Sequence, residues 1–177
     1  IIRSTDWADV GILRDTQFLK IEGVTLRGTG EYNNYMSERP ANVWVHDCEI
    51  IGPGSHMTFS NPIIRNGPEG TYPLYVTDTR IRNTDYGMHR GVLARGVIVE
   101  NVGNDAFVNV QCVINATVRG IDPGSTYWHA DAYQSWGDGP ENRIIYGFHA
   151  TDLHYQGLFL RGDTPGTNNA FVNMFIE

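Results

Sequence analysis

Apolar and polar residues alternate along this chain in short stretches, and one short phrase returns six times. Each copy has an apolar residue, any residue, a second apolar residue, any residue, and then Gly, Asn or Asp. A third apolar position follows after two further residues, and most copies close with Gly or Asn. The six copies span residues 19–28, 43–52, 74–83, 92–101, 111–120 and 148–157. Because alternation indicates strands with one buried face, and Gly, Asn and Asp tolerate positive φ, each copy predicts a strand, a one-residue corner and a second strand.

Repetition of this unit predicts the fold class. No copy contains an amphipathic helix, and steps near twenty residues are too short for propeller blades. A strand, a corner and another strand, repeated at variable spacing, are typical of a coil of a parallel β-solenoid. We therefore expect an all-β parallel β-helix of about six to seven coils, with residues 1–177 as a single domain. Neither end shows a capping sequence, so we expect the chain to be an excerpt of a longer β-helix. The corners are expected at Gly23, Asp47, Asp78, Gly96, Asn115 and Asp152.

Composition narrows the range of partners. The 177 residues are 41% hydrophobic and carry a formal net charge of −7. That charge argues against nucleic acid and against an anionic membrane surface as the main partner. No run approaches the roughly 18 apolar residues of a transmembrane helix, so we expect no membrane insertion. The repeat places the two cysteines, Cys48 and Cys112, about three coils apart, beyond the reach of a disulfide.

A second register carries the candidate chemistry. The segments 85–90, 105–110 and 131–136 can be superposed without gaps, and each begins with aspartate. On consecutive coils Asp85, Asp105 and Asp131 would form a column with about 5 Å between neighbours and about 10 Å between its ends. Like charges so close predict either a bound cation such as Ca²⁺ or a carboxyl with a raised pKa. The alternative is that these aspartates only cap turns through backbone N–H groups.

Residues suited to sugar chemistry surround this column in the sequence. Aromatic faces stack on pyranose rings, polar side chains hold hydroxyls, and cationic side chains pair with a uronate carboxylate or transfer protons. A histidine in a turn is also commonly solvated, and a tyrosine or tryptophan in a strand is commonly a core residue. The candidates for substrate binding and proton transfer are His89, Arg90, Asn104, His129, Tyr133, Gln134, Trp136 and Arg161.

The repeat resembles the right-handed parallel β-helix of the pectin lyase superfamily over nearly the whole chain. The order of motifs is also similar to that of the polygalacturonases, through Asn83-Thr84-Asp85, Asn104-Asp105, His129 and Arg161-Gly162-Asp163. The resemblance implies a polysaccharide groove along this face and a secreted, periplasmic or cell-surface location. It implies that Asp85 and Asp105 activate water, that His129 supports them and that Arg161 binds a substrate carboxylate.

Departures from the polygalacturonase pattern leave the reaction open. Asn104 stands where that family has its general acid, and an amide cannot donate a titratable proton. Gly162 stands in place of a lysine, and Ala130 in place of a glycine. Hydrolysis would therefore need Asp131 as the acid.

Three readings of the function remain at this stage. One is hydrolysis of an acidic polysaccharide, and the second is Ca²⁺-assisted β-elimination with Arg161, Arg90 or His129 as the base. The third is a non-catalytic β-helix that binds glycans, adheres or spaces other domains. Outward-facing carboxylates would favour an enzyme, whereas buried carboxylates saturated by N–H groups would favour the scaffold.

Overall fold

The computed structural model describes residues 2–3, 6–7, 17–27, 41–52, 64–65, 73–124, 129–135, 142–160 and 168–177. These residues form nineteen strands and no helix. Within them, no helix is long and apolar enough to cross a membrane. The described part of the chain is therefore all-β.

The strands form two sheets. One sheet has eleven strands, namely β1 (Ile2–Arg3), β3 (Gln17–Glu22), β5 (Ala41–His46), β7 (Ile64–Arg65), β8 (Leu74–Thr77), β10 (Met88–Arg95), β12 (Phe107–Ile114), β14 (Asp131–Ser135), β15 (Asn142–Tyr146), β17 (Gln156–Leu160) and β18 (Asn168–Val172). The other sheet has eight, namely β2 (Asp6–Trp7), β4 (Thr25–Arg27), β6 (Glu49–Ile51), β9 (Arg80–Thr84), β11 (Ile98–Val102), β13 (Thr117–Ile121), β16 (His149–Leu153) and β19 (Phe175–Ile176).

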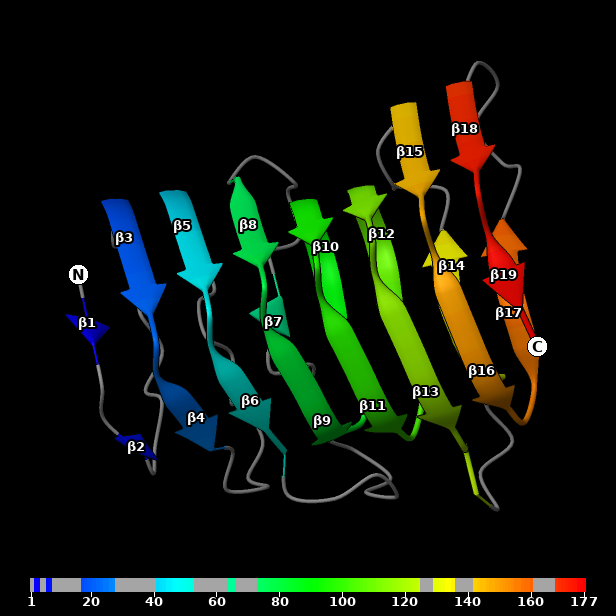
Figure 1. Ribbon diagram of the computed structural model, residues 1–177, viewed down its shortest axis with the longest axis horizontal. Coiled ribbons are helices and arrows are strands. Elements are labelled where there is room, and N and C mark those ends of the chain that lie inside the picture. Colours follow the sequence, from blue (N-terminus) through cyan, green and yellow to red (C-terminus); the bar gives the residue numbers. More distant parts are fainter. Residues whose placement is uncertain are drawn as a thin grey trace.

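Consecutive strands lie in different sheets, except for β7 and β8, β14 and β15, and β17 and β18, which follow one another in the larger sheet. Strand β9, for example, pairs in parallel with β6 before it and β11 after it, and all pairings between the described strands are parallel. Along the long axis the strands follow the order of the sequence, from blue at one end to red at the other (Figure 1). This arrangement of stacked parallel sheets is consistent with a parallel β-helix.

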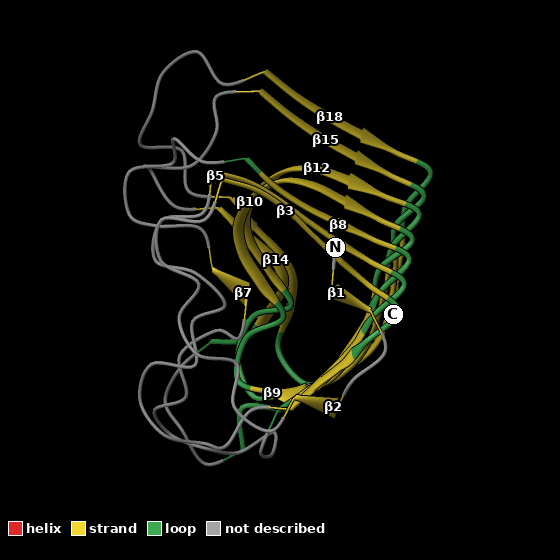
Figure 2. Cartoon of the chain, turned by 90° about the vertical axis from the view of Figure 1, so that its left-hand side faces the viewer, coloured by secondary structure: helices red, strands yellow, loops and turns green. Residues whose placement is uncertain are grey.

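Two long strands bend the larger sheet into two faces. The first half of β10 pairs with β7 through Met88 and Ile64, and its second half pairs with β8. Strand β12 likewise pairs first with β14 and then with β15. Each bend lies at a residue with positive φ, Arg90 at 55° and Asn109 at 52°. In the end view, the face that contains β14 therefore lies apart from the face that contains β15 and β18 (Figure 2).

The core is built from in-register columns of apolar side chains. The second apolar position of the phrase forms one column on the larger sheet, and all its members are completely buried. They are Ile21, Val45, Val76, Ala94, Val113 and Ile145. The third apolar position forms the facing column, each member at most 1% exposed. They are Leu26, Ile50, Ile81, Val99, Val118 and Ala150.

The predicted corners are confirmed in five copies. Their φ angles lie between 50° and 65°, at Gly23, Asp47, Asp78, Gly96 and Asn115. The sixth prediction is wrong, because the corner is Gly147, with φ of 63°, rather than Asp152. Asp152 also has positive φ, but it pairs in the column of Gly120 on the smaller sheet.

Arg143 explains this error. With the sixth corner at Gly147, Arg143 of β15 occupies the first apolar position of the sixth copy. It is in register with Gln111 of β12. A charged residue there hides the phrase, so the sequence pattern predicts the corner five residues too late. Arg143 is nevertheless only 3% exposed.

Arg143 gives a first testable prediction. Its Nε and Nη2 atoms are buried without hydrogen-bond partners among the described residues, and Nη1 donates to Asn169 Oδ1 at 3.3 Å. Because a buried, poorly paired charge is costly, Arg143→Leu is expected to raise the free energy of unfolding by about 1–3 kcal/mol. Urea denaturation followed by circular dichroism measures the change.

Arg82→Leu is the control for this substitution. Arg82 lies on the smaller sheet, where its Nε donates to Glu49 Oε1 at 2.8 Å and its side chain is 35% exposed. Removing a paired, partly exposed arginine is expected to change stability by less than about 1 kcal/mol. If Arg143→Leu were less stable than the unmodified protein, burial of the Arg143 charge would not be destabilising.

Candidate functional site

Two of the predicted aspartates meet where β12 and β14 begin. Phe107 of β12 pairs with Tyr133 of β14, so Asp105 and Asp131 hold equivalent positions in adjacent units. The backbone N–H of Asp131 donates to Asp105 Oδ1 at 2.9 Å. The superposition of 105–110 on 131–136 therefore agrees with the strand register.

The superposition of 85–90 on 105–110 is wrong. Thr84 pairs with Val102, eighteen residues later, and Met88 pairs with Phe107, nineteen residues later. The gap-free superposition requires a separation of twenty residues, so Asp85 is not in line with Asp105. The turn between β11 and β12 holds one residue more than the turn between β9 and β10, so Asp85 is out of the gap-free register, although its charge still acts on Asp105.

His129 completes a cluster with Asp105 and Asp131. Its Nδ1 lies 3.0 Å from Asp131 Oδ2, and Gln134 Nε2 donates to the same oxygen at 3.1 Å. Whether His129 Nδ1 donates to Asp131 Oδ2 or accepts a hydrogen bond depends on the tautomer of the ring. Asp131 is completely buried and Asp105 is 2% exposed, whereas the His129 side chain is 35% exposed. The imidazole is therefore the member of the cluster that reaches solvent.

Burial controls the protonation of the carboxyl groups. It raises the pKa of Asp105 to about 8; the N–H of Asp131 opposes this shift, and repulsion from Asp131 and Asp85 adds to it. Burial also raises the pKa of Asp85 to about 7. The pKa of Asp131 is raised by burial too, against the opposing hydrogen bonds from His129 and Gln134. Carboxyl groups that keep a proton near neutral pH are common at functional sites, so these shifts support the choice of this cluster.

The other candidate residues are divided between the core, the cluster and a second group. Tyr133 is a core residue whose hydroxyl donates to the Val110 carbonyl at 2.7 Å, so its ring has no exposed face. Asn104 Nδ2 donates to the Tyr86 hydroxyl at 2.7 Å, and the Tyr86 ring stacks on His89 with centroids 6.2 Å apart. Gln134 belongs to the cluster, Arg90 lies at the bend of β10, and Trp136 and Arg161 lie outside the described residues.

Sequence reasoning missed Tyr155 as a neighbour of the cluster. Its ring stacks on His129, with centroids 6.1 Å apart and planes 26° apart, and Tyr155 is 57% exposed. The ring of Phe159 lies on His129 as well, with centroids 5.0 Å apart. The copy predicted at 148–157 has Tyr155 at its third apolar position and therefore predicts a buried side chain. The exposure of Tyr155 contradicts that prediction.

The ligand set of the cluster does not fit the calcium site predicted from Asp85, Asp105 and Asp131. Among the described residues, Asp105, His129 and Asp131 each offer a ligand atom within 4.8 Å of the others. Ca²⁺ takes six to eight oxygen ligands. This set provides only two carboxylates, replaces Asp85 by an imidazole nitrogen, and is therefore poorly suited to calcium.

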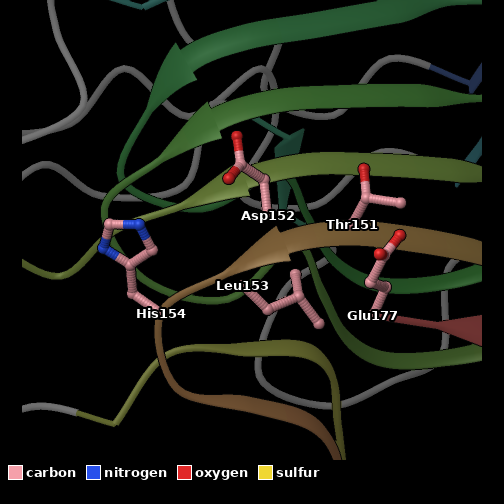
Figure 3. Close-up of a pocket in the computed structure, with 5 residues that line it drawn as sticks. All are labelled: Thr151, Asp152, Leu153, His154 and Glu177. Carbon is pink, nitrogen blue, oxygen red and sulfur yellow. The ribbon is translucent and has the colours of Figure 1, made fainter.

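An open pocket of about 440 Å³ lies elsewhere, along β16. Thr151, Asp152, Leu153, His154 and Glu177 line it, and Figure 3 shows these side chains. His154 Nδ1 lies 3.5 Å from Asp122 Oδ1, with both side chains substantially exposed. The pocket contains none of the residues predicted for chemistry, so the cluster at β12 and β14 remains the candidate site.

Fold and site together define an all-β protein of stacked parallel sheets with a cluster of two buried carboxyl groups and one partly exposed imidazole. Comparisons with protein-family models, with curated proteins and with solved structures found no match for this chain. The cluster of Asp105, His129 and Asp131 is therefore the basis for the proposed function.

Proposed function

We propose that the chain is a right-handed parallel β-helix of the pectin lyase type that cleaves an acidic polysaccharide by β-elimination. The fold part of this proposal is supported by the alternation of most consecutive strands between two parallel sheets. It is also supported by the positive-φ corner that directly follows seven strands of the larger sheet, namely β3, β5, β8, β10, β12, β15 and β18. The resemblance of the repeat to the pectin lyase superfamily also supports the fold part, and membership of that superfamily would imply a location outside the cytoplasm.

One observation carries the chemistry, namely the pairing of a partly exposed imidazole with a buried carboxyl group. The contact between His129 Nδ1 and Asp131 Oδ2 directs the other ring nitrogen, Nε2, away from Asp131. A histidine oriented by a carboxylate is a common arrangement for proton transfer. The exposed ring of Tyr155 beside it offers a surface on which a sugar can stack.

In the proposed reaction His129 removes the C5 proton of a uronate residue. The electron pair of that C–H bond forms the C4–C5 double bond, the C4–O bond breaks, and the leaving oxygen takes up a proton from water. A uronate is required because its carboxyl group acidifies the C5 proton. Arg90 and Arg161 remain the predicted partners of that carboxylate.

Burial of the carboxyl groups favours elimination over hydrolysis. Asp131 and Asp105 are at most 2% exposed, so neither presents a carboxyl group to a glycosidic oxygen. Their ligand oxygens lie within 4.8 Å of each other, which argues against inverting hydrolysis with carboxyl groups about 6.5–9.5 Å apart. Retaining hydrolysis uses groups about 5–5.5 Å apart, and it is burial that argues against it here.

The activity is expected to depend on both members of the pair. Removing the base in His129→Gln, or its orienting partner in Asp131→Asn, is expected to lower the rate by about 100-fold or more. Mass spectrometry of the products from a panel of uronate-containing polysaccharides measures the reaction and its type. Unsaturated products, without added water, are expected from the unmodified protein.

Asp122→Asn is the matched control, because Asp122 and His154 form a similar but exposed pair. This variant is expected to keep full activity. Products that have gained water would show hydrolysis instead of elimination. Full turnover by His129→Gln would show that His129 is not the base.

Non-catalytic glycan binding is the second candidate. It is favoured by the near-complete burial of both carboxyl groups and by the N–H group that Asp131 donates to Asp105. Binding of a polysaccharide by folded protein, without any product, would support this function instead.

A further inference from the structure

We propose that Asp105, Asp131 and His129 form a binding site for a divalent transition-metal ion, with Zn²⁺ as the ion that fits the donor set best. The binding itself does not depend on the proposed sugar chemistry.

The three donors are already close together. Their ligand atoms lie within 4.8 Å of one another, and His129 Nδ1 and Asp131 Oδ2 are 3.0 Å apart. Tetrahedral Zn²⁺ with ligands at about 2.0–2.1 Å places ligand atoms about 3.3 Å from each other. Side-chain movements of about 1 Å would therefore bring the three donors to coordination distance.

The backbone holds these donors in place. Asp105 precedes β12 and Asp131 begins β14, and these strands pair through Phe107 and Tyr133. The Ala106 N–H also donates to the Asp131 carbonyl at 2.9 Å. Gln134 Nε2 donates to Asp131 Oδ2, which is the kind of outer contact that orients a metal ligand.

A second observation points to a cation independently of this proximity. Asp131 is completely buried, and its Oδ1 atom has no hydrogen-bond partner among the described residues. A buried carboxylate oxygen without a donor is costly. A divalent ion would supply the missing partner, and its two positive charges would balance the carboxylates of Asp105 and Asp131.

The donor types select the ion. Imidazole nitrogen together with carboxylate oxygen suits Zn²⁺ and related transition metals, whereas Ca²⁺ and Mg²⁺ prefer oxygen ligands alone. Three protein ligands leave one coordination position for water. The His129 side chain is 35% exposed, so the ion can reach the site from solvent. An ion on Nδ1 would replace the contact between His129 and Asp131. Zinc is therefore expected to inhibit the elimination, a consequence that rests on the proposed function.

Binding is tested on the complete chain after chelator treatment and buffer exchange. Isothermal titration calorimetry with ZnCl₂ is expected to give one ion per chain, and thermal unfolding is expected to shift upward by several degrees. MnCl₂, CaCl₂ and MgCl₂ are the comparison probes, with smaller shifts expected for calcium and magnesium. Each of Asp131→Asn, Asp105→Asn and His129→Gln is expected to weaken Zn²⁺ binding at least tenfold.

Asp122→Asn is the control for exposed histidine–carboxylate pairs and is expected to bind Zn²⁺ as the unmodified protein does. Unchanged zinc affinity in His129→Gln would place the ion elsewhere and overturn the proposal. A larger shift with calcium than with zinc would overturn the choice of ion.

Should the variants fail to fold, Co²⁺ added to the unmodified protein gives a direct test. Cobalt bound with four or five ligands absorbs visible light strongly, and zinc is expected to displace it. No visible band on cobalt addition would overturn the proposal without any variant.

Discussion

The metal-free protein is expected to lose stability as the pH rises from 5 to 8, by up to about 4 kcal/mol through Asp105 alone. Burial raises the pKa of this carboxyl from 3.8 to about 8 in the folded protein, whereas the unfolded chain ionises it near its ordinary value. Between these two values the folded state holds a proton that the unfolded state has released. The contribution of Asp105 to the free energy of unfolding is therefore fully present below about pH 4 and is lost as the pH rises toward 8. Urea denaturation at a series of pH values, with chelator present, measures the slope.

The variant Asp105→Asn tests how much of the pH dependence of stability comes from this carboxyl group. The asparagine keeps an oxygen that can accept the N–H of Asp131 but has no titrating proton. We expect the pH dependence to become clearly weaker in this variant but not to vanish. The remaining slope is expected from Asp85, whose pKa burial raises to about 7, and from Asp131, whose pKa burial raises as well. An equal slope in Asp105→Asn, or an unmodified protein more stable at pH 8 than at pH 5, would contradict the assignment.

Gly52→Ala is expected to lower the free energy of unfolding by about 3 kcal/mol. Gly52 follows β6 and donates its N–H to the Arg82 carbonyl at 2.9 Å. A Cβ atom there would collide with the backbone carbonyl oxygen of Asn83 and lie 2.8 Å from Thr84 Cγ2. Because the colliding oxygen belongs to the backbone of the next unit, the strands would have to separate. Urea denaturation gives the size of the loss.

Gly23→Ala is the matched control at another turn. A Cβ atom there would meet nothing within 4 Å, but Gly23 has φ of +65°. Only the cost of a left-handed alanine, about 1–2 kcal/mol, is expected. If Gly23→Ala proved the more damaging of the two, crowding between neighbouring units would not be what requires glycine at position 52.

The sequence predicts the columns of the fold well, because each depends only on local alternation and on one residue type at the corner. Val45 and Ile50, for example, are buried where the phrase places them. The prediction fails where a residue breaks the local rule. Arg143 occupies an apolar position, so the pattern predicts the last corner at Asp152 and a buried position at Tyr155.

The candidate site was only partly predictable, since it depends on the number of residues in each turn. Asp105 and Asp131 were aligned correctly because the strands after them pair at the same separation. Asp85 was misaligned because one additional residue between β11 and β12 changes the register without changing the residue pattern. The contacts of His129 with Tyr155 and Phe159 join segments about 26 to 30 residues apart, and no local pattern reports them.

The parallel pairing of neighbouring units has a consequence for how the chain is made. Paired residues lie close in the sequence, from eighteen residues apart for Arg80 and Ile98 to thirty-two for Thr117 and His149. During synthesis each new strand therefore finds its partner already complete and needs nothing that has yet to be translated. Assembly can follow the ribosome from the N-terminal strands onward, with the growing edge of each sheet acting as the template for the next strand.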